Sequence, residues 1–232
     1  MVNRPYVVLS CATTIDGYLD DSSDRRLILS NATDFDRVDA LRAESDAILV
    51  GATTIRRDNP RLLVRSAVRR GERVARGLSA SPAKVAVTTT GELDPTCRFF
   101  ADDGTEKLVY CASSAVAEAR ARLGEVAAVR DAGDPPDLPT VLADLSARGV
   151  RRLLVEGGGQ VHTQFLTGGL ADELHLVVAP FFVGDSSAPR FCRDGRYPWT
   201  VDQPAQLLEV RRMDDVVLLR YALRTPCEKG GR

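Results

Sequence analysis

The sequence predicts an α/β fold with a mainly parallel central sheet flanked by helices and an antiparallel hairpin at its C-terminal end. Short apolar runs, such as 47–50 and 153–155, alternate with helical patterns, as expected of parallel strands joined by crossover helices. Two further runs, 207–213 and 216–223, are separated only by Asp214 and Asp215, and this spacing predicts the hairpin.

The first half of the chain begins with a strand at 7–9 and a turn near 14–19. A capping-box variant at 33–36 precedes a helix, and a strand at 47–50 ends at Gly51. Residues 66–82 are rich in arginine and glycine, and we expect a mobile basic loop there. Further strands are expected at 85–87 and 108–110, the second followed by a helix capped by Ser113.

The second half has the clearest periodicity. Asp137 is placed to cap a helix with apolar residues at 138, 141, 142 and 145, and Gly149 follows its end. The strand at 153–155 leads through three glycines into another helix. Residues 174–182 are apolar without clean alternation, which favours a strand buried on both faces over an interface strand.

Composition narrows the class of protein. The 232 residues carry 31 basic and 32 acidic side chains, a balance that argues against a partner such as nucleic acid or a membrane surface. Five scattered cysteines without a C-x-x-C pair, and only two histidines, predict no metal site and a reducing, cytoplasmic location. We expect one domain over 1–232, with a core at about 4–223 and a tail at 225–232.

Several catalytic classes are excluded by missing motifs. The sequence contains no P-loop lysine motif, no G-x-S-x-G and no H-E-x-x-H. His175 is expected to be structural, and His162 is expected to face solvent on its helix. A reaction that needs little side-chain acid–base chemistry fits best, and hydride transfer from a nicotinamide is one, since the cofactor carries the electrons.

Two segments are candidates for binding a nucleotide. Glycines 157–159, between a strand and a helix, permit close backbone approach of phosphate to a helix N-terminus, although a tight strand-to-helix turn is the alternative. Residues 51–62 also follow a strand and carry Thr53, Thr54 and Asp58; a capped helical turn before Pro60 is the alternative. Two arginines, at 42 and 65, are candidates for a phosphate clamp or for simple surface positions.

Together these segments resemble the reductase domain family of riboflavin biosynthesis, whose fold is dihydrofolate-reductase-like. The resemblance covers about residues 4–223, and each motif alone is weak. The matching stretches are 9–17, 41–51, 54–65, 155–159 and 172–180. The resemblance implies an NADPH-dependent oxidoreductase that transfers hydride to the ribosyl imine carbon of a phosphoribosylamino-pyrimidine, 5-amino-6-(5-phosphoribosylamino)uracil.

The resemblance also implies roles for individual residues. Asp58 and Glu156 become the catalytic candidates, Asp58 by orienting or protonating the reacting centre. The residues implied to bind the cofactor are Ala12, Ile28, Thr54, Asp58, Thr89, Gly157, Gly158, Gly159, Gln160 and Val161. Those implied to face the substrate are Arg26, Arg42, Leu62, Arg65 and Glu156.

The chain departs from the family pattern in two respects. Arg25 and Arg26 stand where many members have a small hydroxyl residue, and the signatures of a deaminase domain are missing, so a stand-alone reductase is expected. The substrate therefore stays open between the deaminated and the 2-amino pyrimidine, and dihydrofolate, another pterin or a related pyrimidine is the alternative. A non-catalytic nucleotide-binding module is a further alternative. Family members commonly form homodimers, and the terminal hairpin is a candidate interface.

Overall fold

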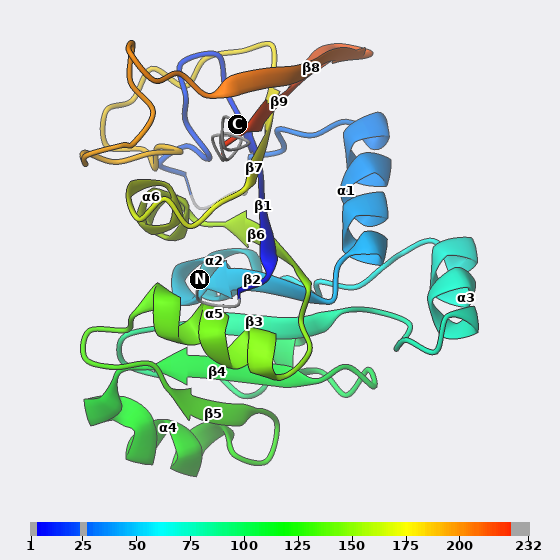
Figure 1. Cartoon of the computed structure of the whole chain (residues 1–232), viewed down its shortest axis with the longest axis vertical. Helices are drawn as coiled ribbons and strands as arrows, with labels where there is room; N and C mark the ends of the chain where they lie inside the picture. The colour runs from blue at the N-terminus through cyan, green and yellow to red at the C-terminus, as the bar shows by residue number, and fades with distance from the viewer. Residues whose placement is uncertain (1–3, 24–26, 224–232) are drawn as a thin grey trace, which may run out of the picture.

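The computed structural model describes residues 4–23 and 27–223, in which strands and helices alternate through most of the chain (Figure 1). The expected tail at 225–232 lies outside these residues. The strands are β1 (Tyr6–Thr13), β2 (Ala47–Gly51), β3 (Ala83–Val87), β4 (Lys107–Cys111), β5 (Ala128–Asp131), β6 (Arg152–Gly157), β7 (Glu173–Val178), β8 (Gln206–Met213) and β9 (Val216–Ala222). The helices are α1 (Ala32–Glu44), α2 (Ala52–Asp58), α3 (Ala67–Ala75), α4 (Val116–Leu123), α5 (Leu138–Ala147) and α6 (Gly159–Thr167), with 3-10 turns η1 (Arg98–Phe100) and η2 (Ser113–Ala115).

All of these strands join one sheet, in the order β5-β4-β3-β2-β6-β1-β7-β9-β8. The pairs from β5 to β7 are parallel, whereas β9 runs antiparallel to β7 and β8 antiparallel to β9. The predicted fold class and hairpin are therefore confirmed. Strand β7 is largely buried, as its unalternating apolar sequence predicted, and it pairs with β1 and β9, but it ends at Val178 rather than near 182.

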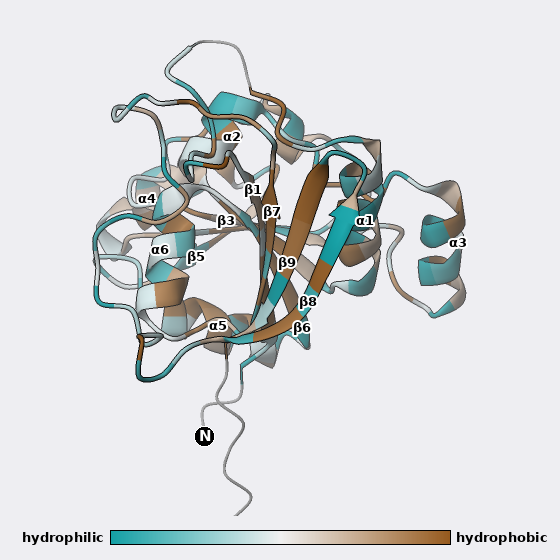
Figure 2. Ribbon diagram, turned by 90° about the horizontal axis from the view of Figure 1, so that it is seen from above, coloured by the Kyte–Doolittle hydropathy of each residue, from teal (hydrophilic) through white to brown (hydrophobic). Residues whose placement is uncertain are grey.

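Helices cover both faces of the sheet because successive strand residues point to opposite sides. Val7 and Leu9 face a core that α5 and α6 complete, while Val8 faces a second core with residues of α1, α2 and α4. Seen from above, β9 is mostly hydrophobic, whereas the edge strand β8 is divided between hydrophobic and hydrophilic residues (Figure 2).

The prediction of a loop over 66–82 is wrong for residues 67–75, which form α3. Ser66 caps this helix by accepting a hydrogen bond from the Arg69 backbone N–H. Arg73 is only 2% exposed, and its guanidinium donates to the carbonyl oxygens of Ala43 at 2.9 Å and Ser45 at 2.8 Å. These carbonyls lie at the C-terminal end of α1, where a helix favours a cation. Docking against α1 thus stabilises a helix that its own sequence does not predict.

The structure also differs from the prediction at the N-terminal caps of two helices. Helix α1 is capped by Asn31, whose side chain accepts from the Asp34 N–H at 3.0 Å, while the hydroxyl of Thr33 donates to Asp214 instead. Ser113 lies in η2 and donates to Asp131 rather than capping α4.

At α5, by contrast, the Asp137 cap is confirmed, and Gly149 just beyond the helix has a φ of +89°.

Candidate active site

A cleft of about 1150 Å³ lies where the carboxyl ends of β1, β2, β3 and β6 meet. This edge is where α/β sheets bind ligands. The cleft brings together every site residue predicted from the sequence that lies in the described part of the chain; Arg26 lies outside it. Those residues are Ala12, Ile28, Arg42, Thr54, Asp58, Leu62, Arg65, Thr89, Glu156, Gly157, Gly158, Gly159, Gln160 and Val161.

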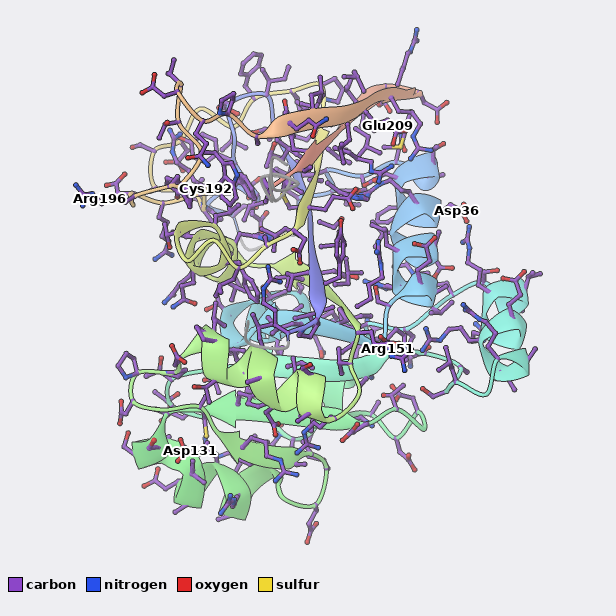
Figure 3. All side chains as sticks on the ribbon, in the orientation of Figure 1. Asp36, Asp131, Arg151, Cys192, Arg196 and Glu209 are labelled. Carbon is purple, nitrogen blue, oxygen red and sulfur yellow. The ribbon has the colours of Figure 1, made fainter. Side chains whose placement is uncertain are left out.

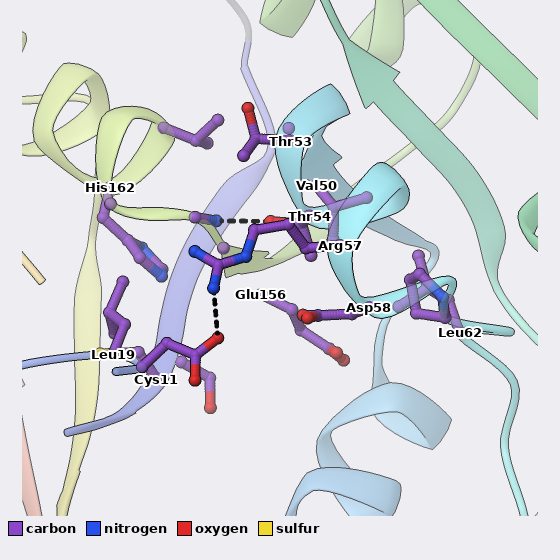
Figure 4. A pocket seen from close by; sticks show the side chains of 18 of the residues that line it. Cys11, Leu19, Val50, Thr53, Thr54, Arg57, Asp58, Leu62, Glu156 and His162 are labelled. Atoms are coloured by element: carbon purple, nitrogen blue, oxygen red, sulfur yellow. Dashed lines mark hydrogen bonds and ion pairs between the residues drawn. The ribbon is translucent and has the colours of Figure 1, made fainter. Parts of the chain in front are cut away.

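The turn between β6 and α6 requires its glycines. Gly157 has a φ of +137°, a conformation that side chains other than glycine's rarely allow. A Cβ on Gly159 would lie 2.2 Å from the carbonyl oxygen of Arg190, closer than any real contact. The Gly158 N–H donates to the Thr54 Oγ1 at 3.0 Å, a bond drawn in Figure 4. This bond joins the two segments that the sequence marked as candidates for binding a nucleotide.

The pairing of β2 with β6 shifts at the same place. Leu49 pairs with Val155 and Val50 with Gly157, so Glu156 is the extra residue of a β-bulge. Bulges often occur beside active sites, where they re-aim a side chain. Here the bulge carries Glu156 into the cleft.

Glu156 is held in the cleft by Arg42 of α1. The Arg42 Nε donates to Glu156 Oε1 at 2.7 Å, and Nη2 donates to Oε2 at 2.6 Å. A third bond runs from Arg42 Nη1 to the carbonyl oxygen of Leu63 at 3.1 Å. Burial lowers the pKa of Arg42, but the Glu156 carboxylate more than compensates and the net shift is upward. The guanidinium is therefore a permanent cation in the cleft wall and fixes Glu156 as an acceptor.

Asp58 provides a second carboxylate, from the last residue of α2, and Figure 4 shows Asp58 and Glu156 both directed into the cleft. Leu62, with a φ of +52°, follows this helix and is 3% exposed. It forms an apolar part of the cleft wall. The two carboxylates thus lie on one side of the cleft, with an apolar surface beside them.

Arginines surround the mouth of the cleft. The Arg65 guanidinium lies 5.3 Å from the centre of the Phe35 ring, while its backbone N–H donates to Asp39. Arg57 of α2 pairs with Asp20 at 3.2 Å across the cleft. Arg65 has an aromatic contact and is otherwise placed to meet an anion.

His162 does not face solvent, and the prediction that it does is wrong. Its side chain is fully buried, and its ring lies 5.4 Å from the ring of Phe191. Burial lowers its pKa to about 4. Neither ring nitrogen has a hydrogen-bond partner within the described part of the chain. The local helical pattern did not predict this, because Phe191 arrives from an irregular segment almost 30 residues later in the sequence.

His175, by contrast, is a buried member of a charged network. Its Nε2 lies 2.9 Å from Glu173 Oε1, and Arg220 donates to the same carboxylate. This arrangement supports its predicted structural role.

Among the arginines of the cleft that sequence reasoning missed are Arg190 and Arg193. They follow β7 in a long segment without helix or strand, and no local pattern marks them. Within residues 4–23 and 27–223, no group of three or more histidine, cysteine or acidic side chains is placed to hold a metal ion. The same residues contain no helix long and apolar enough to cross a membrane.

Comparison with known proteins connects this geometry to a family. The RibD C-terminal domain family matches residues 5–219. The chain belongs to this family. It is 37% identical over 190 residues to an Archaeoglobus fulgidus protein named 2,5-diamino-6-ribosylamino-4(3H)-pyrimidinone 5′-phosphate reductase. The matched region covers 82% of this chain and 86% of that one. A Methanothermobacter thermautotrophicus protein of the same name is 36% identical, with 80% and 82% covered.

Solved structures agree on the fold of this family member. A pyrimidine reductase-like protein from Corynebacterium diphtheriae superposes with a TM-score of 0.81 at 24% identity, covering 95% of this chain and 92% of that chain. RibD from Acinetobacter baumannii gives 0.77 at 26% identity, but only 58% of that chain is covered. Dihydrofolate reductase from Enterococcus faecalis gives 0.51 at 11% identity, with 94% and 98% covered. The dihydrofolate-reductase-like fold and the family predicted from the sequence are confirmed.

Proposed function

We propose that this protein is an NADPH-dependent reductase of riboflavin biosynthesis that reduces the ribosyl imine carbon of a ribosylamino-pyrimidine 5′-phosphate. One observation carries the proposal: the glycine turn with Thr54, the Arg42–Glu156 pair and Arg65 all line one cleft. Family membership supports it, because relatives 37% and 36% identical are named as reductases of such a phosphate. The proposed catalytic unit is a single domain.

The residues of the glycine turn fit a dinucleotide. Gly157 adopts a φ of +137°, which glycine allows, and α6 begins two residues later, at Gly159. The free backbone N–H groups and the positive end of this helix suit a phosphate. Thr54 fixes the turn from α2. When bound, a reduced nicotinamide supplies the hydride. Ala12, Ile28 and Gln160 form the rest of the proposed cofactor wall.

A preference for NADPH over NADH has a candidate basis at Arg56 and Thr89. Arg56 Nη1 donates to the carbonyl oxygen of Glu92 at 3.2 Å, which holds this arginine against the loop after β3. Thr89 lies in the same loop and is exposed. A cation and a hydroxyl in one wall suit a 2′-phosphate. We therefore propose that Arg56 and Thr89 together contact a 2′-phosphate.

The substrate half of the cleft is proposed to use Arg65, Arg42 and Leu62. Arg65 is the proposed phosphate contact, because its guanidinium is exposed at the cleft mouth. Arg42 already donates to Glu156 and Leu63, so it contributes charge and holds Glu156 against the pyrimidine. Asp58 is proposed to orient or protonate the reacting centre, since Glu156 is committed to Arg42.

We also propose a homodimer and a cytoplasmic location. Strand β8 forms one outer edge of the sheet, and Leu207, Leu208 and Val210 on it are 50%, 47% and 61% exposed. An exposed apolar edge strand is suited to pair with a second copy. Free thiols at Cys11, Cys97, Cys111 and Cys192 support a reducing compartment.

The deciding experiment is NADPH oxidation by the purified protein with three substrates: the diamino-pyrimidinone phosphate, its deaminated counterpart and dihydrofolate. We expect turnover with a pyrimidine phosphate and none with dihydrofolate; the relatives' names favour the diamino form. The Asp58→Asn variant, which should lose turnover, controls for contaminating reductases. Tight NADPH binding without oxidation by any pyrimidine phosphate would refute the proposed activity.

A further inference from the structure

The imidazole of His162 is a buried polar group that lines the cleft without a partner. Both ring nitrogens have no hydrogen-bond partner among the described residues, although the side chain is fully buried. A buried polar group without a hydrogen bond is costly, and such groups are rare in folded proteins. The ring therefore has a hydrogen-bonding capacity that the folded chain alone does not use.

The direction of the ring follows from its place in α6. His162 lies in the first turn, and helical side chains point back toward the helix N-terminus, here toward the glycine turn. A Cβ built on Gly157 would lie 3.7 Å from His162 Nε2 and 4.0 Å from Thr54 Oγ1, its nearest neighbours. Because glycine has no side chain, a small space bordered by these two polar atoms stays open. Figure 4 shows the ring reaching from α6 toward the centre of the cleft.

This space lies at the junction of the two halves of the cleft. Gly157 directly follows Glu156, which faces the proposed substrate, and directly precedes Gly158, which bonds Thr54 in the proposed cofactor cradle. The part of a dinucleotide that must meet the substrate is its nicotinamide end. The backbone N–H groups at the start of α6, which suit the diphosphate, begin one residue later.

The charge state of the ring fits a neutral ligand group. Burial lowers the pKa of His162 to about 4, so the imidazole is neutral near pH 7. A neutral imidazole offers one N–H donor and one acceptor nitrogen. A carboxamide offers both as well, whereas a diphosphate offers acceptors alone. This complementarity favours the nicotinamide end over the diphosphate.

We propose that His162 is a positioning residue that hydrogen-bonds the nicotinamide half of the bound cofactor through the space beside Gly157. The inference rests on the proposed function, because it needs a nicotinamide cofactor in the cleft. The His162 side chain thereby orients the nicotinamide relative to Glu156 and Asp58.

The test uses His162→Phe, which keeps an aromatic ring and removes the polar atoms. Equilibrium binding of NADPH is compared with binding of 2′-phospho-ADP-ribose, which has the diphosphate but no nicotinamide. We expect the dissociation constant for NADPH to rise about 5- to 10-fold, the range of one net hydrogen bond, and that for the fragment to stay unchanged. The melting temperature of the free protein should stay equal or rise, since an unpartnered polar group has been removed.

Two control variants separate this role from packing. His162→Asn retains a donor and an acceptor and should recover part of the NADPH affinity. Phe191→Leu disturbs the ring contact of His162 but leaves its nitrogens, and should lower the melting temperature without discriminating between the two ligands.

The outcomes distinguish the inference from the function on which it rests. If wild type binds both ligands and His162→Phe weakens both equally or neither, the inference is wrong and the proposed function stands. A lower melting temperature with unchanged NADPH affinity also overturns it and assigns the ring to packing. If wild type binds neither ligand, the proposed function fails, and this inference fails with it.

Discussion

Arg42 and Glu156 form a two-point ion pair that joins helix α1 to the bulge of strand β6. The two guanidinium–carboxylate bonds measure 2.7 and 2.6 Å, and both side chains are only 12% exposed. The pair lies in the cleft wall, so one interaction both fixes an acceptor toward the proposed substrate and ties two elements of the fold together. Breaking it should therefore affect stability and substrate binding together.

Glu156→Gln should destabilise the protein by about 2 kcal/mol, because Arg42 loses its counter-charge while it stays largely buried. The measurement is the free energy of unfolding by urea, with KM for the pyrimidine phosphate measured beside it. Glu44→Gln is the matched control: its contact with Arg152 is 3.9 Å long and exposed, so the change should stay within about 0.5 kcal/mol. Equal effects of the two substitutions would contradict the importance of the Arg42 pair.

Arg65→Ala should raise KM for the phosphorylated substrate about tenfold or more, with little change in the affinity for NADPH. The proposed reason is the loss of a charge-assisted contact to the substrate phosphate. Steady-state kinetics with the substrate and equilibrium binding of NADPH measure the two quantities separately. Arg151→Ala is the control, because Arg151 precedes β6 at the opposite edge of the sheet (Figure 3). If Arg65→Ala weakens only NADPH binding, Arg65 contacts the cofactor and not the substrate phosphate.

Gly157→Ala should weaken NADPH binding and also lower stability by about 1 to 2 kcal/mol. The φ of +137° strains alanine, and the added Cβ enters the space between His162 and Thr54. Gly149→Ala imposes a similar strain at φ +89°, but no other atom lies within 4 Å of its Cβ. It should lower the melting temperature and leave NADPH affinity intact. If both variants keep full affinity, the space beside Gly157 is not part of the cofactor site.

Local sequence predicted two segments of the candidate cleft because they lie directly after strands. The glycines at 157–159 and the segment 51–62 both follow short buried runs, and parallel strands end at a common edge. The pairing of Arg42 with Glu156 was not predictable from local pattern, since 114 residues separate them. Both residues were predicted to face the substrate, but their mutual contact depends on the tertiary fold.

The failures have a similar cause. Helix α3 was predicted as a loop because its sequence is rich in arginine and glycine, yet Arg73 is satisfied by carbonyls at the end of α1, about 30 residues earlier. His162 was predicted to face solvent because a polar residue on a helix usually does. Its burial depends on Phe191, from a segment with no regular structure.

Replacing Leu208 with glutamate should separate the proposed dimer into monomers. Leu208 lies on the outermost strand, 47% exposed in the single chain, and a charge at a paired edge would be buried without a partner. Sedimentation over a range of concentrations measures the oligomeric state. Val201→Glu is the control, because Val201 is 97% exposed outside the strands. If the wild-type protein is a monomer, the proposed dimer is wrong. If the Leu208→Glu variant is still a dimer, strand β8 is not the dimer interface.

His162 should make the folded protein less stable in mild acid. Its folded pKa of about 4 lies below the ordinary 6.5, so the unfolded chain binds the proton first as the pH falls. The stability that the neutral ring contributes is fully present above pH 6.5 and is lost progressively as the pH falls toward 4. At pH 5 the loss in the free energy of unfolding is about 2 kcal/mol. His162→Phe cannot take up this proton, so its free energy of unfolding should fall less between pH 7 and pH 5 than that of wild type. His175, whose pKa burial also lowers, is retained in both proteins and cancels from the comparison. Urea unfolding at the two pH values measures the difference, and identical pH dependence in the two proteins would mean that His162 is not held neutral in the fold.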